Sequence, residues 1–118
     1  MTVQDLLKQL QTHPETVEFK AVMDTIAAHY NYTPTRFTNG SGDGQVINEA
    51  GSNEGSCKIF AFAQLNQLTP EQTLACFGGY YRDDVLKNPD GNDHGNIRSF
   101  MQHGWNGIHF EQPALTAK

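Results

Sequence analysis

The sequence predicts a single small α+β domain, with four or five helices packed around a short antiparallel sheet. Three observations support this fold class. Apolar residues recur at helical spacing near the N-terminus, two short extended segments flank a Gly-rich turn, and a Phe-rich segment at 59–65 is apolar on every side. The 118 residues fit one domain, because two separate cores would each approach the size at which a hydrophobic interior becomes marginal.

The N-terminal third is predicted to form two helices and a hairpin. Apolar residues at i, i+3, i+4 and i+7 predict a first helix over about residues 3–11. The same periodicity predicts a second helix over about 14–30, with Pro14 at its first position. Glycine and asparagine in the turn that follows favour a hairpin of two strands, at 35–39 and 44–48.

The Phe-rich segment is predicted to be the buried centre of the fold. Ser56 suits the N-cap of a helix over 57–68, and a short strand at 58–62 is the alternative. The sequence Thr-Pro-Glu-Gln at 69–72 is typical of a helix start, with a capping box. The glycine pair at 78–79 is expected to bend or split that helix.

The C-terminal part is predicted to add one helix and one strand. Asp93 suits the N-cap of a helix that ends at His103. Alternating apolar residues predict a strand at 106–110 that joins the hairpin in one sheet. We therefore expect a globular domain over 1–112 and a flexible tail over 113–118.

Charge and cysteine use exclude several classes of protein. The net charge is −5, and the eight Lys and Arg residues are dispersed, so the chain lacks the basic stripe that nucleic acids and anionic membranes require. Its longest apolar run has five residues, whereas a membrane helix needs about 20. Cys57 and Cys76 form no CxxC pair and have apolar neighbours, which favours free thiols in a reducing cytoplasm.

Cys57 is the first candidate for chemistry. It falls in the first turn of the predicted central helix, where free N–H groups and the helix dipole stabilise a thiolate. A nucleophilic thiolate needs an imidazole base, for which His94 and His109 are candidates, with Asp93 or Asp90 as the orienting carboxylate. The spacing does not require this arrangement, and an inert core thiol is the simpler interpretation.

No motif predicts a metal or a cofactor. The segments 90–101 and 39–50 begin like calcium-binding loops, but Met101 and Ala50 stand where the bidentate Glu is needed. The glycines at 40–44 match neither a dinucleotide-binding fingerprint nor a phosphate-binding loop. We interpret the polar stretches at 39–44 and 90–95 as turns.

Three long segments resemble a known family. They are GSNEGSCKIFAFAQL at 51–65, TLACFGGYYRDDVL at 73–86 and DHGNIRSFMQHGWNGIHF at 93–110. These segments are similar to the HopJ family of type III effector proteins, over about residues 45–110 and more generally in the N-terminal helices. The resemblance implies a small, single-domain bacterial protein of mixed α/β fold, with delivery into a host cell by type III secretion. It implies no enzymatic activity, cofactor or catalytic residue.

Two functions follow from these observations. The favoured one is a protein-binding effector or effector-related domain whose partner is a host or bacterial protein. It predicts an exposed apolar or aromatic patch and no deep convergent pocket. The alternative is a small enzyme in a cleft between the loops 39–56 and 88–95, which uses Cys57 with a His–Asp pair or a carboxylate pair such as Glu49 and Glu54.

Overall fold

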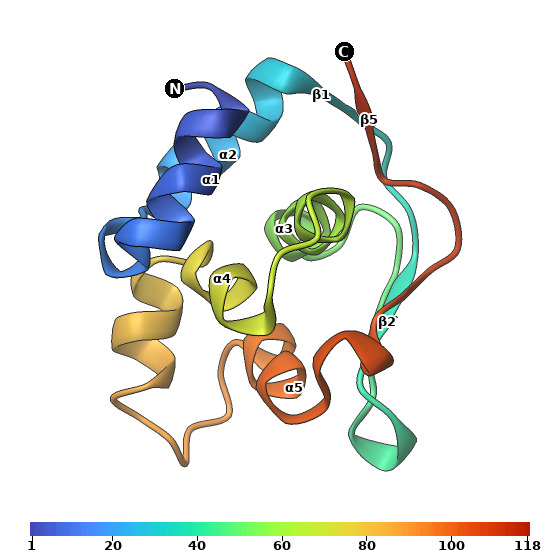
Figure 1. Cartoon of the computed structure of the whole chain (residues 1–118). Coiled ribbons are helices and arrows are strands. Elements are labelled where there is room, and N and C mark those ends of the chain that lie inside the picture. Colours follow the sequence, from blue (N-terminus) through green and yellow to red (C-terminus); the bar gives the residue numbers. More distant parts are fainter.

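Helix α3 (Glu54–Leu65) lies at the centre of the molecule, and the other elements surround it (Figure 1). The structure is a computed structural model that describes residues 1–118. Residues 59–63 of α3 are all buried, as expected for a helix that is apolar on every side. The Phe60 ring packs against the rings of Phe37, Phe77, Phe100 and Trp105. The predicted central helix is confirmed, and the alternative strand at 58–62 was wrong.

Helices α1 (Val3–Thr12) and α2 (Phe19–His29) form the N-terminal side of the fold, with α2 packed on α3. The predicted second helix was wrong at its start, because a 3₁₀ turn over residues 14–16 and two extended residues precede α2. One of these, Val17, is fully buried. The extended chain passes tightly against Gly78, where a Cβ would lie 2.7 Å from the Phe19 nitrogen.

The predicted hairpin and a C-terminal strand form a three-stranded antiparallel sheet. Its order is β3 (Val46–Asn48), β2 (Phe37–Asn39) and β4 (His109–Phe110). The hairpin is confirmed, but β4 is shorter than the predicted strand. Residues 104–107 form a 3₁₀ turn instead, which packs so closely that a Cβ on Gly107 would lie 2.6 Å from the Gly40 nitrogen.

The C-terminal residues belong to the fold, so the predicted tail over 113–118 was wrong. Strand β5 (Leu115–Ala117) pairs antiparallel with β1 (Tyr30–Tyr32), and Figure 1 shows these two strands side by side near the C-terminus. Ala114 and Leu115 are buried. Burial of these two side chains, together with pairing to β1, explains the order of a segment that has little apolar periodicity of its own.

The remaining helices form the other side of the core. Helix α4 (Pro70–Ala75) starts with the predicted capping box at Thr69. The chain then turns at the glycine pair and continues as a π-helix (Tyr80–Val85), which confirms the predicted split. Helix α5 (Gly95–His103) follows and contacts both α4 and β2. None of the helices has the length and the apolar content that a bilayer span requires.

Candidate functional site

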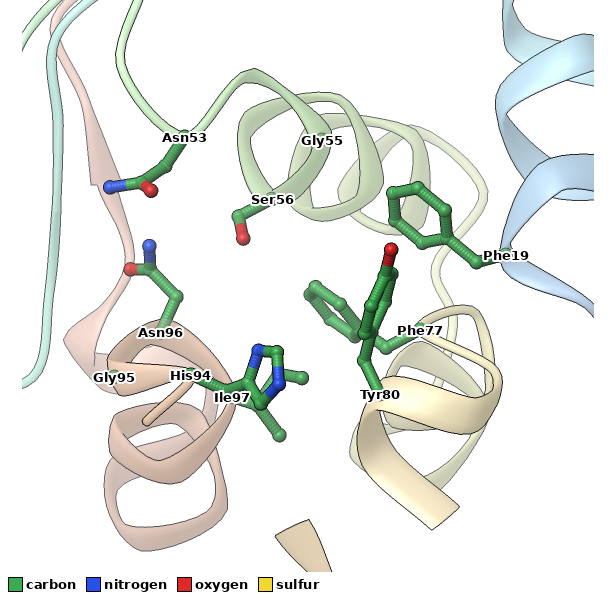
Figure 2. A pocket seen from close by; sticks show the side chains of 10 residues that line it. All are labelled: Phe19, Asn53, Gly55, Ser56, Phe77, Tyr80, His94, Gly95, Asn96 and Ile97. Atoms are coloured by element: carbon green, nitrogen blue, oxygen red, sulfur yellow. The ribbon is translucent and has the colours of Figure 1, made fainter. Parts of the chain in front are cut away.

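A pocket of about 470 Å³ opens between the starts of α3 and α5, and Figure 2 shows its lining side chains. The first residue of α2 and the region around the π-helix complete its walls. The lining residues are Phe19, Asn53, Gly55, Ser56, Phe77, Tyr80, His94, Gly95, Asn96 and Ile97. The pocket therefore contains parts of both loops that the sequence placed around a cleft.

The pocket has an apolar wall and a polar wall. Phe19 and Tyr80 meet edge to face on the apolar side, with ring centroids 5.0 Å apart. Gly55 permits this packing, since a Cβ there would lie 2.9 Å from the Phe19 ring. On the polar side, Figure 2 shows the Ser56 hydroxyl and the His94 imidazole facing the same space. A ligand with an apolar body and hydrogen-bonding atoms at one end fits these two walls.

The polar wall consists of two helix starts that lack side-chain caps. The N-cap residues are Asn53 for α3 and His94 for α5, both in the left-handed region, with φ of 52° and 51°. The predicted N-caps Ser56 and Asp93 were therefore wrong. Ser56 lies inside the first turn of α3, and the Asp93 carboxylate accepts a 2.6 Å hydrogen bond from Arg98 instead.

These open starts leave backbone donors free at the pocket. The first intrahelical bonds are donated by the amides of Cys57 in α3 and Arg98 in α5. The amides of residues 54–56 and 95–97 have no acceptor within the chain, as is general for the first turn of an uncapped helix. Five of these six residues line the pocket. The polar wall is therefore formed by residues whose backbone N–H donors have no partner, and the Ser56 hydroxyl is a further donor.

His94 is held in place by a carboxylate. Its Nε2 lies 2.9 Å from Asp84 Oδ2 and 3.8 Å from Asp93 Oδ2. Its ring lies beside that of Tyr80, with centroids 5.3 Å apart. The hydrogen bond from Arg98 lowers the pKa of Asp93. The structure thus brings the predicted residues His94 and Asp93 together and adds Asp84, whose role the sequence did not reveal because it lies on a different element.

Cys57 lies apart from this pair. Its side chain is buried and does not line the pocket. Burial raises the pKa of the thiol, whose neighbours are Tyr32, Thr35 and Glu54. No imidazole is hydrogen-bonded to it, and His109 is exposed on β4. A thiol with these surroundings is protonated at neutral pH and is a poor nucleophile.

The other acidic candidates are also separate from the pocket. Glu49 forms an ion pair with Arg36 near the sheet, with a nitrogen–oxygen distance of 3.4 Å. Glu54 starts α3, and Asp90 is exposed in the turn that precedes α5. No group of three or more His, Cys, Asp or Glu side chains is arranged to hold a metal ion.

The fold and the site define a small α+β domain with an amphipathic pocket at two open helix starts. The chain belongs to the HopJ family, because the model of the HopJ type III effector protein family matches residues 3–115. A solved structure described as the crystal structure of unknown function protein VPA0580 is 53% identical, with a TM-score of 0.95. The match covers 100% of this chain and 95% of that one. Comparison with curated proteins gives no match.

Proposed function

We propose that this HopJ-family chain is a binding module that receives a segment of a partner protein in the pocket between α3 and α5. The observation that carries the proposal is the meeting of an aromatic wall with a row of free N–H donors in one open site. A polypeptide segment offers both complements, namely an apolar side chain and the carbonyl or carboxylate oxygens beside it.

The exposed aromatic side chain at the rim supports protein binding. Tyr80 is 45% exposed and reaches over the pocket from the π-helix (Figure 2). Exposed tyrosines beside a concave site are common anchors for partner segments. For a binding function we expected an exposed apolar or aromatic patch and no deep convergent pocket, and here the exposed aromatic side chain lies at an open pocket.

The family description guides the choice of partner. HopJ proteins are described as type III effectors, so we propose a protein of a host cell, reached by secretion from the bacterial cytoplasm, as the partner. A bacterial protein is the second choice.

A small probe tests this proposal directly. N-acetylphenylalanine carries an aromatic ring and nearby oxygens, and N-acetylglycine is the matched control without the ring. At about 0.3 kcal/mol per non-hydrogen atom, a probe of about 15 such atoms is expected to bind with a Kd on the order of 1 mM. Amide resonances of residues 53–56 and 94–97 should shift with the aromatic probe and much less with the control. Equal shifts with both compounds, or shifts elsewhere only, would contradict the proposal.

Two matched variants locate the binding. Tyr80→Ala removes an exposed aromatic side chain from the pocket. Leu86→Ala removes an aliphatic side chain of similar exposure, 47% against 45%, outside the pocket. Tyr80→Ala is expected to weaken probe binding several-fold, whereas Leu86→Ala should leave it unchanged. Equal affinities for the two variants would show that the probe binds elsewhere.

The catalytic alternative has one observation in its favour, the His94–Asp84 pair at 2.9 Å. A carboxylate in this position orients an imidazole as a base. However, no hydroxyl or thiol of the chain is hydrogen-bonded to His94. Thiol labelling at neutral pH tests the form of the catalytic alternative that uses Cys57. Slow labelling of Cys57 in the native protein is expected here, whereas fast labelling would favour the enzyme.

A further inference from the structure

A buried asparagine behind the pocket joins the two helix starts. Asn48, the last residue of β3, is 1% exposed. Its Oδ1 accepts hydrogen bonds from Asn53 Nδ2 at 2.7 Å and from Asn96 Nδ2 at 2.9 Å. Asn53 is the N-cap of α3, and Asn96 is the second residue of α5. One side-chain oxygen thus connects both helices that form the polar wall.

The connection is reinforced from the sheet. Asn48 Nδ2 donates back to Asn96 Oδ1 at 3.1 Å. Asn39, which is fully buried on β2, donates to the backbone oxygen of Asn96 at 2.8 Å and to its Oδ1 at 3.1 Å. The start of α5 is therefore held by two strands, and the only hydrogen-bonded link from it to the start of α3 passes through Asn48. Buried and mutually bonded amides of this kind hold their elements in one geometry.

The bond to Asn48 also keeps the start of α3 open. An asparagine at an N-cap ordinarily accepts a hydrogen bond from the second or third amide of its own helix. Here the Asn53 side chain is directed to Asn48, and its backbone is left-handed. Gly55 and Ser56 line the pocket, and their amides consequently have no competing side-chain acceptor.

We infer that Asn48 is a positioning residue of the pocket, which fixes the separation of the α3 and α5 starts and holds Asn53 away from its own helix. The inference rests on the proposed binding function. Asn48 does not line the pocket, so it acts on a ligand only through Asn53 and Asn96.

Asn48→Ala tests this role, with Asn66→Ala as the matched control. Asn66, like Asn48, makes side-chain hydrogen bonds. Its Nδ2 donates to Tyr30 Oη at 3.2 Å and to the Phe62 oxygen at 2.9 Å, but Asn66 lies outside the pocket. Asn48→Ala should shift the amide resonances of both Gly55 and Gly95 without ligand, and weaken N-acetylphenylalanine binding roughly tenfold, as for loss of an outer hydrogen-bond partner. Asn66→Ala should change neither quantity. All measurements are made well below Tm, so that lost stability alone leaves the affinity of the folded protein unchanged.

The two readouts separate the possible failures. Unchanged Gly55 and Gly95 resonances in Asn48→Ala, or shifted resonances with unchanged probe affinity, overturn the positioning role. A wild-type protein that does not bind the probe overturns the proposed function, while the two resonances still decide whether Asn48 sets the helix starts. If Asn48→Ala does not fold, Asn48→Ser retains an acceptor oxygen and is expected to give smaller changes in the same direction.

Discussion

Two helices of this protein have starts that are closed by a side-chain cap, whereas three have open starts without one. Thr2 and Thr69 form complete capping boxes on α1 and α4, in which Asp5 and Gln72 bond back to the cap. Helices α3 and α5 have no side-chain cap, and both begin at the pocket. The two capped starts thus lie outside the pocket, whereas the two helices that form its polar wall have no side-chain cap.

Backbone conformation sharpens this difference. The α2 start also lacks a side-chain cap, but its N-cap Glu18 is in ordinary extended conformation. Of the helix starts, only those of α3 and α5, which form the polar wall, have left-handed non-glycine residues at the N-cap, Asn53 and His94. Strained residues often mark functional sites. However, Gln67 is left-handed as well and lies outside the pocket, so the combination of strain with an open helix start is what distinguishes the site.

The largest effect is expected in the buried middle of α3, a helix with an open start. Phe60→Ala should destabilise the protein by about 3–5 kcal/mol, because the fully buried ring leaves a cavity among four aromatic neighbours. Urea denaturation measures the loss. A loss below about 1 kcal/mol would show that the buried middle of α3 does not support its open start.

A capped helix should respond differently from an open one. Thr69→Ala removes the capping hydrogen bond to the Gln72 amide and is expected to cost about 1 kcal/mol. Probe binding should be unchanged, since α4 does not line the pocket. The comparison between closed and open starts breaks down if this variant loses probe affinity at a temperature where it is fully folded.

Replacing a left-handed residue with glycine should change the stability of the protein differently inside and outside the pocket. Gln67→Gly is expected to stabilise the protein by about 0.5–1 kcal/mol, because glycine removes the left-handed strain and the Gln67 side chain forms no hydrogen bond. His94→Gly should give a smaller gain or a loss, since it also removes the contact with Asp84. Equal gains in chemical denaturation would mean that the His94–Asp84 pair contributes nothing to the folded state.

The smallest effect concerns Asp93, which pairs with Arg98 instead of capping α5. Its lowered folded pKa means that the ionised carboxylate stabilises the fold above the ordinary value of 3.8. This stabilisation is lost as the pH falls through the lowered folded pKa. Asp93→Asn should therefore lower Tm slightly at neutral pH, and the difference should vanish in acid. A Tm difference that is constant across this pH range would contradict the lowered pKa.

Local signals predicted most elements of the fold. The central helix, the capping box at Thr69, the split at the glycine pair and the hairpin each depend on residues within a few positions of one another. The errors occurred where a distant contact decides the backbone. Val17 is drawn into the core ahead of α2, and β5 pairs with β1 across almost the whole chain.

The candidate site was predicted only in part. The loops 39–56 and 88–95 and the residue His94 were identified from the sequence, and parts of both loops do meet at the pocket. Cys57 belongs to the same helix as Ser56 but does not line the pocket, because only the tertiary structure decides which face of an apolar helix meets the pocket. Asp84 carried no signal, since its pairing with His94 depends on the π-helix that follows the glycines.

The sequence by itself determined the α+β class, the identity of the buried helix and the family, because hydrophobic periodicity and long matching segments are properties of consecutive residues. Only the tertiary structure decided that α3 and α5 begin side by side with their amides free. That arrangement depends on Asn48, whose hydrogen bonds reach residues from three separate parts of the chain. Contacts of this range leave no periodic trace in a sequence, because they are set by packing after the elements have formed.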